Sequence, residues 1–378
     1  MAAKFLKNSF LIVFLLIGLE INAEKYPSNH EPLAIGSPAP DFKLKGVDGN
    51  LYSLASFSKA KLLVVIFTCN HCATAQSYED RIIRLVEDYK SKSVAFVAIM
   101  PNDPASLRLD ELDFSDIGDS YEEMKIRAAE KKFNFPYLYD GETQSASNAY
   151  GPQATPHIFI FDQHRILKYR GRIDDTESIY KTPKTSDTRD AIESLLNDHE
   201  PVVPTTKVFG CSIKWAEKKE LVEKYKVMWA NEPVSINSID DGELKEIMIN
   251  NTPKLRLIYF WTANCDACTK QFGEFITINR MYRDREFEFL SVHAAQKSDR
   301  SSILDFLKSQ QASNKNYLLT QGGRSLKDMI NDPAWNGDLP LTLLVEPGGK
   351  IAYSKQGNID PALLKKTIIE NHLLGRYP

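Results

Sequence analysis

The sequence predicts an α/β protein of two domains, each with a central sheet flanked by helices, and three observations lead to this prediction. The chain has 378 residues, 43% of them hydrophobic, which is enough for two compact cores. In each half, at 62–89 and 255–282, an apolar run leads into two cysteines three positions apart and then into a helical pattern. Each half later contains an X-Pro step followed by a strand hairpin. This shared order of elements indicates an internal repeat.

The N-terminus resembles a cleaved signal peptide over residues 1–23. Lys4 and Lys7 precede an apolar run at 10–17, and Ala23 precedes a polar stretch. The run is well short of the roughly 20 residues that a membrane-spanning helix needs. We therefore expect a periplasmic or secreted protein with no transmembrane segment in the mature chain.

The first domain is expected at 33–200. Residues 43–54 read as a hairpin, and 62–67 and 94–100 as buried strands. A helix between those two strands makes a right-handed βαβ unit with a parallel sheet. The acidic segment 103–119 is expected to be a loop insertion. Further elements are expected as helices at 121–133 and 187–196, a strand at 137–139 and a strand hairpin at 157–170.

A connector is expected at 201–231, because prolines and the loss of periodicity end the first domain there. It carries Cys211 and four large apolar side chains that need burial, so we expect it to dock on the first domain: Phe209, Ile213, Trp215 and Trp229.

The second domain is expected at 232–378 and repeats the order of the first. Its strands are expected at 255–260, 287–292, 316–319, 341–345 and 351–353. One helix is expected to follow its cysteine pair, with further helices at 242–249, 301–307, 326–330 and from 360 onward.

The chain has five cysteines, and four of them form two C-x-x-C pairs. A pair so close in sequence closes too short a loop to stabilise the fold much. The start of a helix favours a thiolate over a thiol, which is the condition for nucleophilic sulfur chemistry. We therefore expect Cys69 and Cys265 to attack disulfides, and Cys72 and Cys268 to resolve the mixed disulfides.

Both halves resemble the thioredoxin superfamily. With the segments 36–42, 67–72 and 210–215, the first half resembles the peroxiredoxin-like redoxins of the AhpC/TSA type. With the segment 260–268, the second half resembles exported thioredoxins of the TlpA and ResA type. The resemblance implies two thioredoxin-like three-layer domains, each a central mixed β-sheet flanked by helices.

The same resemblance implies a thiol–disulfide oxidoreductase without a cofactor. Its partners would be protein thiols and disulfides, together with a membrane or periplasmic thiol reductant. Pro156 and Pro340 would be cis-prolines that face the disulfides and accept substrate backbone.

Three further residues are candidate modulators of these sites. A His71 imidazolium would favour a thiolate at Cys69, whereas the Asp266 carboxylate would oppose one at Cys265, making the first site more oxidising than the second. Cys211 is either a third redox partner of the first site or a buried thiol of the connector.

A thiol-dependent peroxidase is an alternative function. Peroxiredoxins resemble one another through a P-x-x-x-T-x-x-C pattern. Counted back from Cys72, the proline and threonine places hold Val65 and Cys69, and from Cys69 they hold Leu62 and Ile66. The residues that would polarise a peroxide are therefore missing from the pattern.

A copper-binding metallochaperone of the same fold is the second alternative. Cys69, Cys72 and His157 would supply soft and imidazole ligands. A zinc site with four thiolate ligands would need the two pairs roughly 15–20 residues apart, whereas here they lie in separate halves of the chain. We therefore assign no metal. The net charge of −3 provides no basic stripe, and no nucleic-acid partner is expected.

Overall fold

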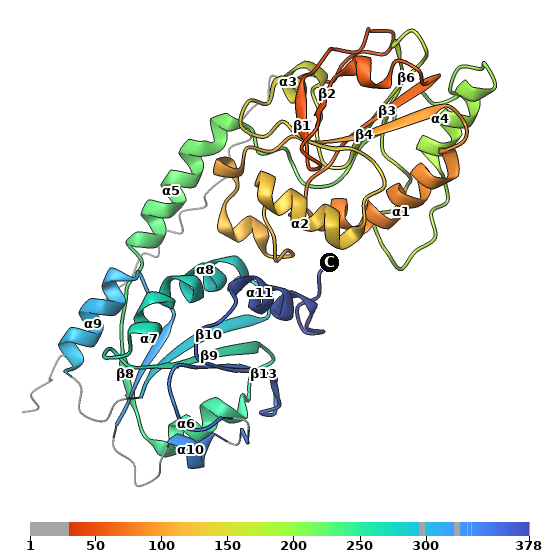
Figure 1. Ribbon diagram of the computed structural model, residues 1–378. Coiled ribbons are helices and arrows are strands. Elements are labelled where there is room, and N and C mark those ends of the chain that lie inside the picture. The colour runs from red at the N-terminus through yellow and green to blue at the C-terminus, as the bar shows by residue number, and fades with distance from the viewer. Residues whose placement is uncertain (1–29, 295–298, 321–325, 331, 334, 378) are drawn as a thin grey trace, which may run out of the picture.

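Two β-sheets organise the computed structural model, which describes residues 30–294, 299–320, 326–330, 332–333 and 335–377 (Figure 1). The signal peptide expected at 1–23 lies outside these residues. Helix α5 (Lys219–Ala230) runs between the two domains. None of the helices in the described part of the chain has the length and apolarity needed to cross a bilayer.

The first sheet has seven strands in the order β2-β1-β5-β4-β3-β6-β7. The central strands β3, β4 and β5 are parallel, whereas β6 and β7 are antiparallel, so the sheet is mixed. The predicted parallel βαβ unit is confirmed. The strands are β1 (Leu44–Gly46), β2 (Leu51–Tyr52), β3 (Leu62–Phe67), β4 (Val94–Met100), β5 (Tyr137–Tyr139), β6 (His157–Phe161) and β7 (Leu167–Gly171).

Helices cover both faces of this sheet. Successive side chains of β3 point to opposite faces, and each face has its own apolar cluster, which is why the strand is apolar throughout. One cluster packs against α1 (Ala73–Tyr89), α2 (Tyr121–Lys131) and α4 (Asp187–Leu196). The other packs against α3 (Ser145–Tyr150).

The second sheet has six strands in the order β13-β12-β9-β10-β11-β8. Its strands β9, β10, β11 and β8 are parallel, and β12 and β13 are antiparallel. They span β8 (Asn237–Ile239), β9 (Leu255–Trp261), β10 (Phe287–His293), β11 (Lys315–Leu319), β12 (Leu341–Val345) and β13 (Ile351–Gln356). Its helices are α6 (Asp241–Ile249), α7 (Asp266–Lys270), α8 (Phe272–Tyr282), α9 (Arg300–Ser309), α10 (Leu326–Met329) and α11 (Pro361–Glu370).

The helix predicted from the spacing of Phe272, Phe275 and Tyr282 is present as α8, but a separate short helix precedes it. The chain breaks at Gln271 between α7 and α8. Gln271 has φ −95° and ψ 0°, and its side chain bonds Tyr259 Oη at 3.0 Å and the backbone N–H of Ile359 at 2.9 Å. These tertiary contacts hold the break, whereas α1 of the first domain is continuous.

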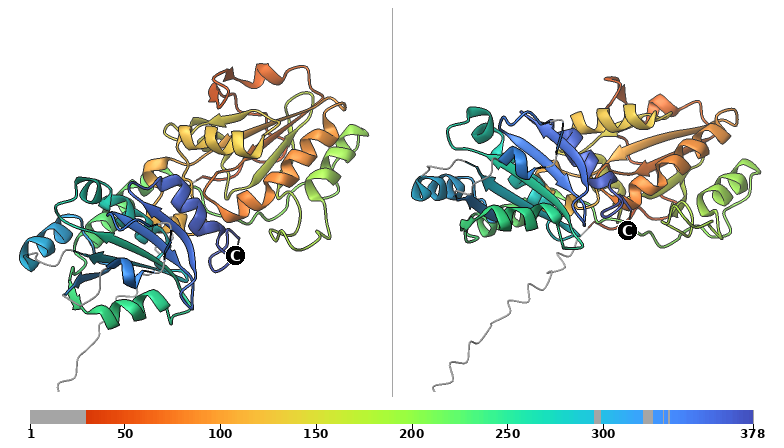
Figure 2. Two further views of the ribbon diagram at one scale, coloured as in Figure 1. Left: turned by 60° about the horizontal axis from the view of Figure 1, so that its bottom comes forward. Right: turned by 90° about the horizontal axis from the view of Figure 1, so that it is seen from below.

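The segment predicted as a loop insertion, 103–119, joins the two domains. Leu112 packs in the apolar core of the second domain. Tyr282 Oη donates to the carbonyl of Ser115 at 2.8 Å, and Arg376 Nη1 lies 2.6 Å from Asp116 Oδ1. Helix α11 and the C-terminal end of the chain lie at this junction between the domains (Figure 1 and Figure 2). The segment therefore belongs to the first domain in sequence and packs on the second.

Candidate active site

The first cysteine pair lies between the end of β3 and the start of α1. Cys72 is the N-cap of α1, and its Sγ accepts the backbone N–H of Ala75 at 3.4 Å. Cys69 lies in the turn between this strand and this helix, as the sequence predicted, and the helix begins at Ala73. Cys69 is 3% exposed and Cys72 is 0% exposed. Both sulfurs therefore lie inside the domain, and the N-terminal dipole of α1 acts first on Cys72.

The peptide Thr155-Pro156 is cis and lies against the pair. Cys69 Sγ and Thr155 Oγ1 are 3.0 Å apart, within hydrogen-bonding distance. Cys72 Sγ lies 3.5 Å from the carbonyl oxygen of Thr155. The predicted cis-proline and the predicted cysteines are thus brought together. The hydroxyl of Thr155 is a contact that the sequence analysis missed.

His71 forms a buried ion pair with Asp119. Its Nδ1 donates to Asp119 Oδ2 at 2.6 Å. The carboxylate also accepts the backbone N–H groups of Asn70 and His71 and the side-chain amide of Asn102, at 2.7–3.1 Å. Four donors compensate the cost of burying this charge. Asp119 comes from the acidic segment, 48 residues from His71, and no spacing in the sequence identified it.

The charges of this pair set the ionisation of His71 and Asp119. Burial lowers the pKa of His71, but the charge of Asp119 and the hydrogen bond to it outweigh burial and raise the pKa. Burial raises the pKa of Asp119, but the charge of His71 and the four donors hold it below its usual value. The ion pair with Asp119 therefore favours the imidazolium form of His71, whose side chain is buried inside the domain.

The two thiols of the first site differ in acidity. Burial raises the pKa of Cys72, but hydrogen bonds from Cys211 and Cys69, the charge of His71 and the Ala75 N–H together bring it well below its usual value. Burial raises the pKa of Cys69 well above its usual value, and its contacts with Cys72 and Asp119 add to this. The surroundings of the two sulfurs therefore favour a thiolate at Cys72 over one at Cys69, whereas the sequence led us to expect attack by Cys69.

Cys211 lies next to this thiolate. Its backbone N–H donates to Cys72 Sγ at 3.3 Å, although the two residues are 139 positions apart. The connector around it docks on the first domain: Lys214 N–H donates to Asn102 Oδ1 at 2.9 Å, and Trp215 stacks on His30. The first site thus contains three cysteines.

The second cysteine pair has a different setting. Cys265 and Cys268 form a disulfide, and Cys265 is the N-cap of α7, with its Sγ accepting the backbone N–H of Cys268 at 3.1 Å. Cys265 is partly exposed and Cys268 is buried. The peptide Leu339-Pro340 is cis, and the carbonyl of Leu339 lies 4.0 Å from Cys265 Sγ.

The charged groups near the second cysteine pair are exposed to solvent, so they influence its sulfurs less than His71 influences Cys72. Asp266, the candidate modulator, has a side chain that is 93% exposed and lies 3.5 Å from Lys270. His293 is buried, its Nε2 accepts the N–H of Ala263 at 3.1 Å, and burial lowers its pKa to about 4. It is therefore neutral near pH 7. No buried ion pair comparable to that of His71 adjoins Cys265 in the described residues.

The described residues contain one cluster with the spacing of metal ligands. The ligand atoms of Cys69, His71 and Asp119 lie within 4.8 Å of one another. The oxygens of Asp119 already accept four hydrogen bonds, one of them from His71 Nδ1, so the arrangement is that of an ion pair. His157, a ligand in the alternative copper site, does not join this cluster: its Nδ1 accepts the N–H of Gln153 at 3.1 Å, and burial lowers its pKa to about 3.

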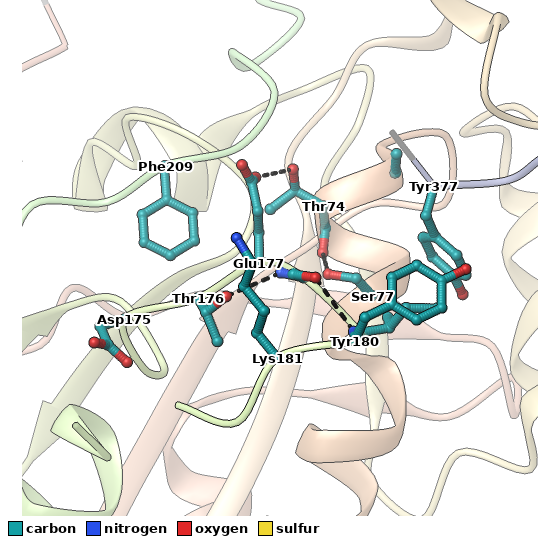
Figure 3. A pocket seen from close by; sticks show the side chains of 12 residues that line it. Thr74, Ser77, Asp175, Thr176, Glu177, Tyr180, Lys181, Phe209 and Tyr377 are labelled. Carbon is teal, nitrogen blue, oxygen red and sulfur yellow. Dashed lines mark hydrogen bonds between the residues drawn. The ribbon is translucent and has the colours of Figure 1, made fainter. Parts of the chain in front are cut away.

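A groove of about 580 Å³ adjoins the first site (Figure 3). Thr74 Oγ1 donates to Glu177 at 2.8 Å, which ties a loop of the first domain to the start of α1. The groove lies beside the chain segments that carry Cys72 and Cys211. It is lined by Ala73, Thr74, Ser77, residues 175–181, Phe209 and Tyr377.

The fold and the paired thiols define the class of the chain: it is an oxidoreductase with thioredoxin-like domains. Residues 34–191 match the family model described as Redoxin, so the first domain belongs to the redoxin family. The comparison with curated proteins found no match.

Several solved structures are similar to parts of the chain. A hypothetical protein from Sinorhizobium meliloti 1021 is 30% identical over 49% of this chain and 97% of its own, with a TM-score of 0.44. An uncharacterized conserved protein from Geobacillus kaustophilus is 39% identical over 48% and 92%, with a TM-score of 0.43. A thiol:disulfide interchange protein of the thioredoxin family from Chlorobium tepidum TLS is 20% identical over 42% and 94%, with a TM-score of 0.31.

Proposed function

We propose that this chain is an exported thiol–disulfide oxidoreductase whose two C-x-x-C sites exchange disulfides with protein partners. One observation carries the proposal. In both domains a cysteine at the start of a helix lies against the residue that precedes a cis-proline: Cys72 against Thr155, and Cys265 against Leu339. Such a site places a reactive sulfur beside backbone of the kind that a substrate polypeptide pairs with, and at the first site the connector occupies part of that backbone.

Exchange at the second site begins at its exposed sulfur. A partner thiolate attacks Cys265 Sγ, forms a mixed disulfide and breaks the bond to Cys268, which leaves as a thiolate. A second thiolate of the partner then attacks the partner's own sulfur in that mixed disulfide and releases Cys265. The partner dithiol is oxidised to a disulfide, and the site gains two electrons and two protons. The reverse sequence reduces a partner disulfide.

At the first site the structure supports Cys72 as the sulfur that reacts and leaves. The charge of His71 and the two backbone N–H groups that point at Cys72 Sγ stabilise its thiolate. Thr155 Oγ1 lies 3.0 Å from Cys69 Sγ, where its hydroxyl can form a hydrogen bond with this sulfur.

The signal-like pattern at residues 1–23 supports export, and an oxidising compartment suits a protein whose second site carries a disulfide. A membrane or periplasmic thiol reductant would then return the sites to the dithiol state. Fractionation of cells that produce the chain with and without residues 1–23 tests export. Equal retention of both forms in the cytoplasm would contradict it.

Turnover of insulin disulfides tests the activity. We would compare the chain from residue 24 onward with Cys72→Ser, Cys265→Ser and the double variant, with dithiothreitol as the reductant and with a metal chelator present. Each single variant should lose part of the activity, and the double variant should fall to the background rate of dithiothreitol. A double variant as active as the parent would overturn the proposal.

The same assay separates the two alternatives. Copper is expected to be dispensable, because His157 does not lie with Cys69 and Cys72 in a ligand cluster. Peroxide consumption by the reduced chain is expected to stay slow, since the places of the peroxidatic proline and threonine before Cys72 hold Val65 and Cys69. Fast consumption that depends on Cys72 would favour the peroxidase.

A further inference from the structure

The segment 209–212 of the connector covers the first site. Thr155 and Cys211 form an antiparallel bridge, in which Thr155 N–H donates to the carbonyl of Cys211 at 3.0 Å. Gly210 has φ +127°, and a Cβ at this position would lie 2.0 Å from the carbonyl oxygen of Thr155. Only glycine allows so close an approach. The connector thus occupies backbone groups next to cis-Pro156 that a partner polypeptide would otherwise meet.

This pairing presents Cys211 to Cys72. The Cys211 N–H donates to Cys72 Sγ at 3.3 Å. Cys72 therefore has a cysteine neighbour on each side, Cys69 and Cys211. Cys69 and Cys72 are buried, whereas Cys211 is only half-buried.

The residues after Cys211 anchor the segment firmly. Lys214 Nζ pairs with Glu111 at 2.6 Å, and its N–H donates to Asn102. Ala216 N–H donates to Gln144 Oε1 at 2.8 Å, and Trp215 is buried against His30. A mere tether between domains would need none of these contacts. They fix the position of Cys211 beside Cys72.

We propose that Cys211 is the third redox cysteine of the first site: it forms a disulfide with Cys72, and partner thiols exchange with the first site through it. This inference rests on the thiol–disulfide exchange proposed above. The partner is a protein dithiol or disulfide. The connector segment already pairs with Thr155, where the backbone of that partner would otherwise bind.

Exchange through Cys211 proceeds in two steps of thiolate attack. A partner thiolate attacks Sγ of Cys211, forms a mixed disulfide and breaks the Cys72–Cys211 bond, whose electron pair leaves with Cys72. A second partner thiolate attacks the partner's sulfur, forms the partner disulfide and releases Cys211, which takes a proton from water. Two electrons pass from the partner dithiol to the site.

The environment favours this order of attack. An incoming thiolate reaches the half-buried Cys211 more easily than either buried sulfur. The neighbouring Cys72 thiolate raises the pKa of Cys211, whereas the pKa of Cys72 is held low, so Cys72 is the better leaving group. Phe209, two residues before Cys211, and Ala73, directly after Cys72, both line the groove.

Disulfide mapping tests the inference in the full chain with Cys265→Ser and Cys268→Ser, which silences the second site. The reduced protein is equilibrated with oxidised and reduced glutathione, free thiols are blocked with N-ethylmaleimide, and linked peptides are identified by mass spectrometry. We expect a Cys72–Cys211 peptide, and we expect it to persist when Cys69→Ser is added. Cys211→Ser should lower the rate of exchange with glutathione about tenfold or more. Ser212→Ala, one residue along, is the matched control and should not change it.

Two outcomes would overturn the inference: Cys211 fully blocked by maleimide under all conditions, or Cys211→Ser exchanging as fast as the parent. If Cys69–Cys72 still forms in those cases, the proposed function survives and only the role of Cys211 fails. If the parent itself exchanges with neither glutathione nor insulin, the proposed function fails instead. The linked-peptide map and the rate thus report on the two claims separately.

Discussion

The two cysteine pairs follow corresponding strands, β3 and β9, yet they are built in opposite ways. In the first domain the N-cap of the helix is the second cysteine, Cys72, and both cysteines are buried beneath the connector. In the second domain the N-cap is the first cysteine, Cys265, which is partly exposed beside Leu339. The same order of strands and helices therefore supports one covered and one open site.

The charged pairs near the two sites differ in burial, as the cysteines themselves do. The first site has a buried ion pair, His71 with Asp119, whose imidazolium acts on Cys72. The second has an exposed pair, Asp266 with Lys270, which water and salt screen. A charge near a thiol changes its chemistry strongly only where the surrounding structure excludes water.

The largest expected effect comes from breaking the buried pair. Asp119→Asn should destabilise the chain by about 3–5 kcal/mol, because it leaves the His71 charge buried and replaces an acceptor of four hydrogen bonds with an amide. Urea unfolding followed by fluorescence measures the change. Asp266→Asn is the matched control at the second site, and an equal loss in both variants would refute the contrast.

The pH dependence of this contribution has a defined sign. The lowered pKa of Asp119 gives stability that is present above about pH 3.9 and is lost as the pH falls through the folded value. The raised pKa of His71 gives stability that is present below about pH 6.5 and is lost as the pH rises through the folded value. The stability difference between the parent and Asp119→Asn should therefore be greatest between these limits.

The next largest effect concerns access to the sulfurs. In the reduced native chain, N-ethylmaleimide should modify Cys265 roughly a hundredfold faster than Cys69 or Cys72, since the covered site must open by about 3 kcal/mol first. Peptide mapping of samples quenched at successive times measures the rates. If N-ethylmaleimide modified the cysteines of both pairs at similar rates, the connector would not cover the first site.

A third effect is the ionisation of Cys72. In a chain with Cys265→Ser and Cys268→Ser, thiolate absorbance at 240 nm should persist at pH 7 and disappear as the pH falls through the lowered pKa of Cys72. His71→Gln should move this transition to higher pH, because it removes the nearby positive charge. Cys72→Ser should abolish the transition. A transition that instead depends on Cys69 would restore the order of roles expected from the sequence.

The smallest effect is expected at Asp266. Its side chain is almost fully exposed and lies beside Lys270, so Asp266→Asn should change the reduction potential of the second site by no more than about 10 mV. Redox titration of the chain with Cys69→Ser and Cys72→Ser measures it. A shift several times larger would show that the field of Asp266 reaches the Cys265–Cys268 disulfide despite the solvent.

Local patterns predicted much of this molecule. The runs at 62–67 and 255–260 were predicted as strands because a strand buried on both faces is mostly apolar, and the second run is apolar except for Arg256. The pairs of cysteines followed them directly, and the resemblance indicated the cis peptides before Pro156 and Pro340. The break at Gln271 was missed because contacts from Tyr259 and Ile359 hold it.

The sequence by itself determined the central strands and the cysteine pairs that follow them, since each of these patterns depends on neighbours within a few residues. The prolines that face the pairs were indicated by the resemblance. The tertiary structure decided which cysteine ionises. That depends on burial, on Asp119 from a distant loop and on Cys211 from the connector, and none of these has a fixed spacing from Cys72. Charges and thiols interact through space, and folding alone brings these segments together.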